Sequence, residues 1–465
     1  MKKLVWAIGF ILICFSLNAQ DIIGQWNGIL KFQGMQLRLV FNIEKVDTIF
    51  AATMDSPDQG ANGIPVKSVS FKNSVLKLEL PNLFIQYEGI LNEESTIVGN
   101  FKQGAISIPL TLTKEIAKKE VVIRPQEPQK PYGYYTEDVY FENRKENFSL
   151  AGTLSLPQKE GVFPAVILIS GSGPQNRDEE VFGHKPFLVL SDYLTKNGIA
   201  VLRFDDRGTA ESKGNFQTAT SFDFAIDVES AVNYLRSRKE INKKKIGLIG
   251  HSEGGIIAPM LAAKDKEISF IVLIAGTGII GSDLLLLQQE LIGRANGISE
   301  TELQKSKKES KAAFGLIQKF ENNDSLKLEL GSFIKQHLDD EILAQIQNGM
   351  SLDDFIKNQV HVLTTSWMYN FLNYDPSIIL EKVKCPVLAL NGSKDLQVPS
   401  KINLDAIETA LKKAKNKNIT IKELAGLNHL FQECETGSPV EYAKIEQTFS
   451  PTALKEIADW IKSQW

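Results

Sequence analysis

The stretch Ile246-Gly247-Leu248-Ile249-Gly250-His251-Ser252-Glu253-Gly254 decides the fold of the larger part of this chain. Its first four residues are mostly apolar and predict a short buried strand, and the residues up to Ala262 predict a helix. Between them two glycines bracket a serine. A strand, a sharp turn and a helix in this order form the setting in which a Gly-x-Ser-x-Gly sequence exposes a serine hydroxyl. Ser252 is therefore the candidate nucleophile; the alternative is an ordinary turn that opens a helix.

Other short apolar runs predict strands that are covered on both faces. These runs are Ala165–Ile169, Ile199–Arg203, Phe270–Ile274 and Val387–Leu390. Amphipathic stretches such as Phe222–Arg238 separate them, and segments 139–141 and 148–156 predict an opening hairpin. Alternating strands and helices predict an α/β fold with a doubly wound, mostly parallel sheet. The interval from about 281 to 375 breaks this alternation with helices, so we expect a helical cap inserted over the carboxyl edge of the sheet.

Two further residues complete a candidate catalytic triad. A serine hydroxyl needs a base to take its proton, and the base needs a carboxylate to hold its tautomer. His429 follows the last predicted strand, Ile419–Leu424, and Asp395 follows the strand that ends at Leu390. The carboxyl ends of parallel strands meet at one edge of a sheet, so we expect Asp395 and His429 beside Ser252.

The other four histidines are better explained by packing or exposure. His251 adjoins the serine, but neighbouring side chains on a sharp turn diverge, so we expect it to pack structurally. His184 follows the first loop and is expected to be structural as well. His337 and His361 fall in the predicted cap, where we expect surface or packing roles.

A negative charge that develops on a substrate oxygen needs backbone N–H donors. One is expected from Glu253, the residue after the serine. The second is expected from the loop Ser170-Gly171-Ser172-Gly173-Pro174, with Ser172 as the first choice and Gly173 as the second. A phosphate-binding loop is the alternative, but the segment lacks the lysine and the spacing of a P-loop.

From about Tyr134 to Trp465 the chain resembles the α/β-hydrolase superfamily, specifically bacterial exported serine esterases related to prolyl-oligopeptidase-like and serine-aminopeptidase-like hydrolases. The matching stretches are Ser170–Asp178, Arg203–Gly208, Gly250–Gly255 and Asn391–Asp395. The order Ser252, Asp395, His429 is also that of the superfamily. Ser170 departs from the histidine that often stands there, which leaves the second oxyanion donor open. The resemblance implies no catalytic role for the Asp205-Asp206-Arg207-Gly208 turn.

Residues 20–115 predict a separate all-β domain, because their apolar and polar residues alternate as in strands with one buried face. A meander of this kind closes into a small barrel or sandwich. Gly24-Gln25-Trp26 resembles the start of lipocalin-like barrels. The domain is either a ligand-binding or targeting module or, as we favour, a stabilising appendage. Residues 116–134 are rich in charge and proline and predict a linker to residues 135–465.

Residues 1–19 predict a signal peptide. Lys2 and Lys3 precede an apolar run from Leu4 to Leu17, which is shorter than a membrane-spanning helix, and Ala19 offers a cleavage site. A retained membrane anchor is the alternative. We expect an exported protein, periplasmic or extracellular, with no stable membrane insertion after cleavage. Cys385 and Cys434 would then remain, and we expect two free thiols at opposite ends of the sheet.

These features together predict a serine hydrolase that cleaves carboxylic esters through an acyl-enzyme. A net charge of −4 gives no reason to expect a nucleic-acid partner. The expected partner is a small ester or a short peptide; no cofactor or metal is expected, and the oligomeric state is open. The first alternative is an aminopeptidase-like or dipeptidyl-peptidase-like enzyme, for which Asp339, Asp340 and Glu341 could anchor a charged terminus. The second is a non-catalytic ligand-binding protein. Trp367, Met368, Tyr369 and Phe371 could line an acyl pocket or be core.

Overall fold

The chain forms two compact units, Met1–Leu30 with Leu37–Lys119 and Lys31–Gln36 with Glu120–Trp465. The computed structural model describes residues 22–32, 35–57, 61–83, 85–103, 106–116, 124–338, 343 and 351–465. The predicted signal peptide and the cap carboxylates 339–341 lie outside these residues. Among the described residues, no helix combines the length and the apolar character needed to cross a membrane.

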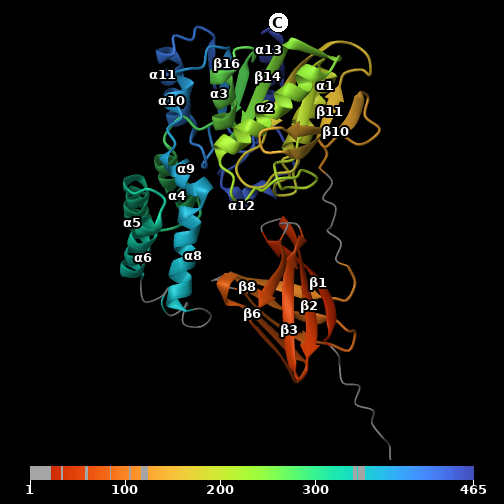
Figure 1. The fold of residues 1–465 in the computed structure, drawn as a ribbon, viewed down its shortest axis with the longest axis vertical. Helices are drawn as coiled ribbons and strands as arrows, with labels where there is room; N and C mark the ends of the chain where they lie inside the picture. Colours follow the sequence, from red (N-terminus) through yellow and green to blue (C-terminus); the bar gives the residue numbers. More distant parts are fainter. Residues whose placement is uncertain are drawn as a thin grey trace, which may run out of the picture. The chain divides into compact units, whose positions relative to one another are not determined.

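The second unit is built on an eight-stranded sheet with the order β10-β11-β13-β12-β14-β15-β16-β17 (Figure 1). Its strands are β10 (Tyr135–Asn143), β11 (Phe148–Leu156), β12 (Phe163–Ile169), β13 (Ala200–Phe204), β14 (Ile241–His251), β15 (Ile271–Ile274), β16 (Val387–Gly392) and β17 (Ile419–Leu424). The β10–β11 hairpin and the β11–β13 pair are antiparallel, and the remaining neighbours are parallel. The predicted doubly wound, mostly parallel sheet is confirmed.

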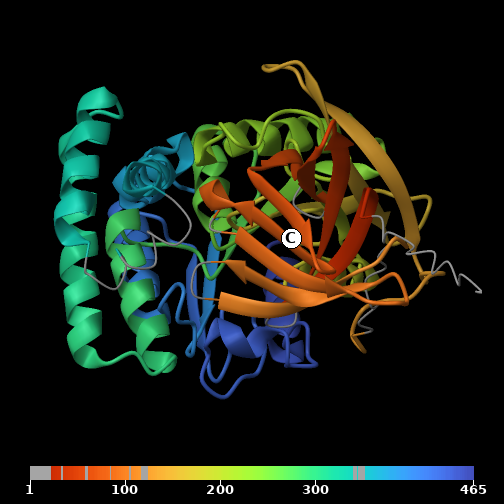
Figure 2. The ribbon, with the colours of Figure 1, turned by 90° about the horizontal axis from the view of Figure 1, so that it is seen from below.

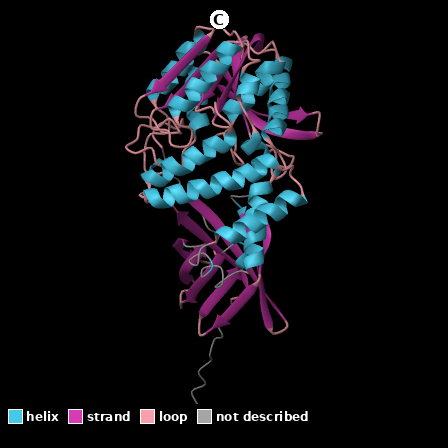
Figure 3. Cartoon of the chain, turned by 90° about the vertical axis from the view of Figure 1, so that its left-hand side faces the viewer, coloured by secondary structure: helices cyan, strands magenta, loops and turns pink. Residues whose placement is uncertain are grey.

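Both faces of this sheet are buried, as its continuous apolar runs indicate. Along β12, Ala165, Ile167 and Ile169 enter one core cluster, whereas Val166 and Leu168 enter another. The first cluster lies under α2 (Ser221–Ser237), α3 (Gly254–Lys264), α10 (Ser377–Leu380) and α11 (Ser400–Lys413). The second lies under α1 (Pro186–Lys196) and α13 (Pro451–Lys462). Helices therefore flank the sheet on both sides (Figure 3).

A helical insertion between β15 and β16 forms the predicted cap. Its described helices are α4 (Gly281–Ala295), α5 (Glu300–Lys319), α6 (Asp324–His337), α8 (Leu352–Thr364) and α9 (Ser366–Asn373). They share a small core of their own, which includes Phe314, Ile317 and Leu330. The short α12 (Pro439–Tyr442) lies outside this insertion, after β17. Ser438, just before α12, donates its hydroxyl to Asn296, just after α4 (2.9 Å).

The first unit is all β, as predicted, and consists of two antiparallel sheets around one core (Figure 2). One sheet holds β1 (Gly24–Phe32), β2 (Met35–Val46), β3 (Ile49–Ser56) and β4 (Ala61–Val66); the other holds β5 (Ser68–Lys72), β6 (Val75–Leu80), β7 (Ile85–Leu91), β8 (Ile97–Gln103) and β9 (Ile106–Leu112). A bridge between Asn27 and Thr113 links the two sheets. Trp26, Phe41 and Tyr87 fill the interior with large side chains.

The described part of the expected linker, which begins at Arg124, belongs to the second unit and bonds to residues near its carboxyl end. The Arg124 guanidinium donates to the carbonyl oxygens of Ala443 (2.8 Å) and Ile445 (2.9 Å). The Gln126 amide donates to the carbonyl oxygen of Phe449 (2.8 Å). These contacts hold Arg124 and Gln126 against the rest of the second unit, whereas the proline-rich composition alone predicts an extended segment without such partners. The two described cysteines, Cys385 before β16 and Cys434 after β17, are free thiols.

Candidate active site

The turn between β14 and α3 presents Ser252 at the carboxyl edge of the sheet. The residue has φ 52°, a left-handed conformation that a non-glycine residue adopts only when its surroundings enforce it. Its backbone N–H donates to the carbonyl oxygen of Ile274 (2.9 Å) on β15. A Cβ at Gly250 would lie 2.0 Å from the Gly254 carbonyl oxygen, and one at Gly254 would lie 2.2 Å from that of Ile169. Both glycines are therefore required by close backbone approach.

Asp395 and His429 meet at the same edge as a buried hydrogen-bonded pair. His429 Nδ1 lies 2.8 Å from Asp395 Oδ2, and both side chains are almost fully buried. Asp395 Oδ1 accepts the backbone N–H groups of Gln397 and Val398, each at 2.8 Å. Three donors thus hold the carboxylate, and Nδ1–H of the imidazole points at it. This arrangement leaves Nε2 of His429 as the nitrogen that can accept a proton.

Ser252 and His429 lie on adjacent loops that are joined through His251. The Nε2 atom of His251 lies 3.0 Å from the backbone oxygen of His429, and the two imidazole rings are 4.9 Å apart between centroids. Among the described residues, no hydrogen bond joins the Ser252 hydroxyl to the His429 ring. Hydrogen bonds of this kind are often long without substrate and tighten in the complex.

The loop after β12 lies against the serine and is held from two sides. A Cβ at Gly171 would lie 3.2 Å from Cβ of Ser252. Asp206, partly buried, accepts the Ser170 hydroxyl (2.8 Å) and the Gln175 backbone N–H (2.9 Å). Burial raises the pKa of Asp206 well above its ordinary range, although these two hydrogen bonds oppose the rise. The Asp205–Gly208 turn, which was given no catalytic role, thus supports the loop.

The predicted oxyanion donors stand in different surroundings. Ser172 is exposed, and Glu253 is buried directly after the serine. Among the described residues, neither backbone N–H has a protein acceptor. The N–H of Gly171, the residue before Ser172, cannot serve as an oxyanion donor because it already donates to Oε1 of Glu179 (2.8 Å).

The side chain of Glu253 connects the turn to the cap. Its Oε1 atom accepts the Ser221 hydroxyl (2.5 Å) and the indole N–H of Trp367 on α9 (2.8 Å). Burial raises the pKa of Glu253 above its ordinary range, and the two hydrogen bonds only partly offset this effect. The ring of Trp367 stacks on Phe371 (centroids 5.0 Å apart), which belongs to the main core. Met368 and Tyr369 pack on the cap core.

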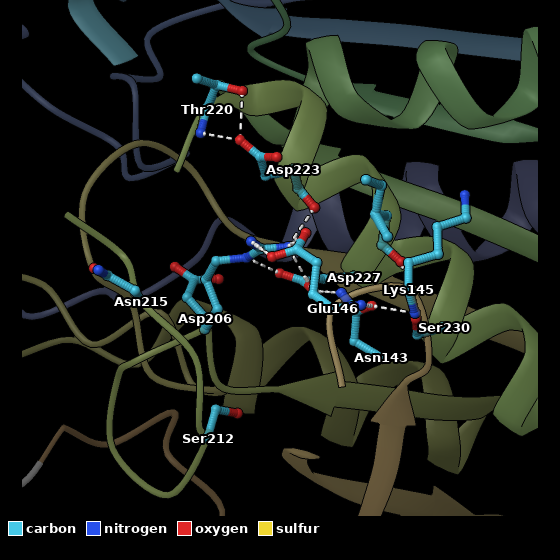
Figure 4. Close-up of polar contacts among 12 residues, drawn as sticks. Asn143, Lys145, Glu146, Asp206, Ser212, Asn215, Thr220, Asp223, Asp227 and Ser230 are labelled. Atoms are coloured by element: carbon cyan, nitrogen blue, oxygen red, sulfur yellow. Dashed lines mark hydrogen bonds and ion pairs between the residues drawn. The ribbon is translucent and has the colours of Figure 1, made fainter. Parts of the chain in front are cut away.

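A buried ion-pair network underlies the turn that carries Asp206 (Figure 4). Arg207 contacts Asp227 (2.7 Å) and Glu146 (2.8 Å), and Asn143 donates to Asp227 (2.7 Å). Because every charge in this cluster is paired, removing one partner would leave a buried charge uncompensated. The network is structural and holds in place the turn whose Asp206 supports the loop after β12.

Sequence reasoning missed Glu179. Its Oε1 atom lies 2.9 Å from Nδ1 of His251 and also accepts the Gly171 N–H. The residue has φ 51° and is 3% exposed. It lies in an irregular loop where periodicity gives no signal. Within the described residues, no group of three or more His, Cys, Asp or Glu side chains is arranged to hold a metal ion.

The sheet order, the covering helices, the inserted cap and the left-handed serine after β14 define an α/β-hydrolase architecture. Residues 228–338 match the family model described as "BAAT / Acyl-CoA thioester hydrolase C terminal". The chain is 25% identical to esterase EstD of Thermotoga maritima over 413 residues, which cover 86% of this chain and 88% of EstD. This chain belongs to the α/β-hydrolase superfamily and is a hydrolase.

Two other similarities are more limited. Acyl-coenzyme A thioesterase 1 of Mus musculus is 31% identical over 125 residues, which cover 27% of this chain and 26% of that protein. The solved structure of the Pyrococcus furiosus esterase PF2001 covers 71% of this chain and 91% of its own, with 16% identity and a TM-score of 0.43.

Proposed function

We propose that this chain hydrolyses carboxylic esters through Ser252 as nucleophile, His429 as general base and Asp395 as the orienting acid. The observation that carries the proposal is the buried contact between His429 Nδ1 and Asp395 Oδ2 (2.8 Å), at the edge where Ser252 stands in a left-handed turn. The similarity to EstD over most of both chains supports an ester as the bond that is cleaved.

In this mechanism His429 Nε2 takes the proton of the Ser252 hydroxyl as its oxygen attacks the carbonyl carbon of the ester. The resulting imidazolium, stabilised by Asp395, returns the proton to the leaving alkoxide as the carbon–oxygen bond breaks. Water then attacks the acyl-enzyme in the reverse sense, with His429 again as base. The acid and free Ser252 are the products.

The backbone N–H groups of Glu253 and Ser172 are proposed to bind the oxyanion. Support comes from the position of Glu253 at the amino end of α3, where the helix dipole favours negative charge. Support for Ser172 comes from the packing of its neighbour Gly171 against Ser252. Gly173 is the second choice for this donor.

Thioesters are a second candidate class of substrate. The match of residues 228–338 to the acyl-CoA thioester hydrolase family model favours them, and this segment begins within α2 and includes the serine turn. The chemistry of the triad is the same for an oxygen ester and a thioester, so the pocket would decide. Export through the predicted signal peptide, residues 1–19, is part of the proposal and would favour substrates found outside the cytoplasm.

The test is a substrate panel with a nucleophile variant. We expect p-nitrophenyl esters to be hydrolysed faster than acyl-CoA thioesters and aminoacyl-anilides. Ser252→Ala should lower kcat by roughly a millionfold, as loss of the nucleophile does in comparable triads. Ser237→Ala, which removes an exposed hydroxyl from the end of α2, is the matched control and should retain full activity. Ester hydrolysis by Ser252→Ala within tenfold of wild type would refute the assignment.

A further inference from the structure

A second acid–imidazole pair lies beside the proposed triad. His251, the last residue of β14, is buried with Nδ1 2.9 Å from Glu179 Oε1 and Nε2 3.0 Å from the backbone oxygen of His429. Both ring nitrogens therefore face oxygen atoms. A carbonyl oxygen can only accept a hydrogen bond, and a neutral imidazole has only one N–H to donate.

The Glu179 carboxyl group does not supply the missing proton. The Oε1 atom that faces His251 already accepts the Gly171 N–H (2.8 Å), so it acts as an acceptor in this contact. An imidazole is also a stronger base than a carboxylate by about two pKa units in water, so a proton shared between them stays on the ring. A ring that donates from both nitrogens is doubly protonated, which makes both contacts of His251 charge-assisted hydrogen bonds.

The groups that face His251 favour this charge. Burial lowers the pKa of His251, but the charge and hydrogen bond of Glu179, the His429 carbonyl and the charge of Asp395 outweigh it, so the net pKa lies above its ordinary value. The His429 ring also contacts that of His251, at 4.9 Å between centroids. Glu179 itself is held in a left-handed conformation, a strain that persists only where surrounding structure enforces it.

The pair contacts three parts of the proposed site. Glu179 binds the backbone of Gly171, next to the proposed oxyanion donor Ser172. His251 binds the backbone of His429, the proposed base, and adjoins Ser252. One ion pair thus spans the oxyanion loop, the nucleophile turn and the base loop.

We propose that Glu179 and His251 form a fixed-charge positioning pair, in which a permanently protonated His251 holds the backbones of Gly171 and His429 in register with Ser252. This proposal rests on the proposed ester hydrolysis for its kinetic consequences. Its structural part, the doubly protonated ring, can be tested without any activity. Neither residue is assigned to touch the substrate.

The first measurement is the protonation state of His251 in the full-length wild-type protein labelled with ¹⁵N-histidine. We expect both ring nitrogens of His251 to carry protons at neutral pH, and to keep them at a pH where a free imidazole has already lost its second proton. His184 is an internal control, since it is also buried and bonded at both nitrogens, to Thr448 Oγ1 (3.0 Å) and the Tyr442 carbonyl (2.9 Å), but has no carboxylate partner. Burial and the charge of Arg124 lower its pKa to about 4, so it should appear neutral.

The second measurement is the pH profile of Glu179→Gln. The amide can still accept a hydrogen bond but carries no charge, so His251 should lose its second proton as the pH rises through the neutral range. We expect kcat to fall by roughly 10- to 100-fold at pH 8, because misplacement of reacting groups by about 1 Å costs this much. KM should stay within about twofold of wild type. The alkaline limb of the pH profile should move to lower pH, because His251 loses its charge there. His184→Gln should lower the Tm and leave kcat and the pH profile unchanged.

Two further variants divide the role of the ring. His251→Asn keeps a donor toward Glu179 and loses the one toward His429, whereas His251→Gln does the opposite. Both should lower kcat. A wild-type His251 that is singly protonated at pH 7, or a Glu179→Gln variant with the wild-type pH profile, would overturn the proposal. If Ser252→Ala remained active, the proposed function would fall while the protonation measurement on His251 still stood.

Discussion

Two carboxylate–imidazole pairs lie at the same edge of the sheet, and they differ in whether Nε2 of the imidazole has a hydrogen-bond partner. In the pair of Asp395 and His429, the carboxylate holds Nδ1 and the structure leaves Nε2 without a protein acceptor among the described residues. In the pair of Glu179 and His251, a carbonyl oxygen occupies the second nitrogen as well. The first imidazole can exchange a proton, and the second can only keep one.

Both imidazoles are buried and lie beside a carboxylate. These two features alone therefore do not identify a general base. What separates the two rings is whether the far nitrogen already has a partner. A free nitrogen gives a residue that can carry protons during a reaction. An occupied one gives a fixed charge that organises its neighbours.

The same substitution at both carboxylates tests the comparison most strongly. Asp395→Asn should lower kcat by about 10⁴-fold, since an amide that donates to Nδ1 forces the wrong imidazole tautomer. Glu179→Gln, for which a loss of 10- to 100-fold is expected above, makes the equivalent change at a ring that does not move a proton. Steady-state kinetics of the two purified variants on one p-nitrophenyl ester give the ratio. Equal losses would mean that the two pairs have the same role.

A third buried carboxylate, Glu253, sharpens the comparison because the partners the structure shows for it are neutral donors. Trp367→Phe removes one of these donors and keeps the ring that stacks on Phe371. We expect a loss of roughly 1.5 to 3 kcal/mol in the free energy of unfolding, the value typical of a hydrogen bond to a charged group. The loss should be larger at pH 8 than at pH 5, because only the ionised carboxylate needs the donor strongly. Denaturant unfolding at the two pH values measures it, and a loss independent of pH would contradict this role.

Glu253→Gln is expected to have the smallest effect. Burial raises the pKa of Glu253, so the unfolded chain releases this proton at a lower pH than the folded chain. Wild-type stability should therefore decrease as the pH rises from the ordinary glutamate range through the folded pKa. The Gln variant should show a shallower decrease, seen as a Tm that gains on wild type toward alkaline pH. The charge of Glu253 is one of the causes that raise the pKa of Asp206, so the Gln substitution also reduces that rise and adds to the shallower decrease.

Sequence patterns predicted the sheet and the Asp395–His429 contact because both depend on local signals. Each proposed triad residue lies in the turn or loop that follows a strand, and parallel strands bring such positions to one edge regardless of their distance in sequence. The cap was predicted because the alternation of strands and helices breaks there. The β unit was predicted because apolar and polar residues alternate with a period of two.

The remaining parts of the site depend on contacts that no local pattern encodes. Glu179 lies eight residues after Gly171 in an irregular, left-handed loop, and its role exists only because that loop folds back onto His251. His251 was expected to pack structurally; it is buried as expected, but its partners come from positions 179 and 429. The contact of Trp367 with Glu253 joins residues 114 positions apart.

The central claim is that Ser252 is made reactive by an imidazole with a free nitrogen. It is tested most directly by labelling the full chain with a fluorophosphonate and locating the adduct by mass spectrometry. The account predicts one adduct, on Ser252, that forms at least a hundredfold more slowly in His429→Ala and at the wild-type rate in His184→Gln. Labelling of Ser252 that is unaffected by His429→Ala, or an adduct at another serine, would contradict it.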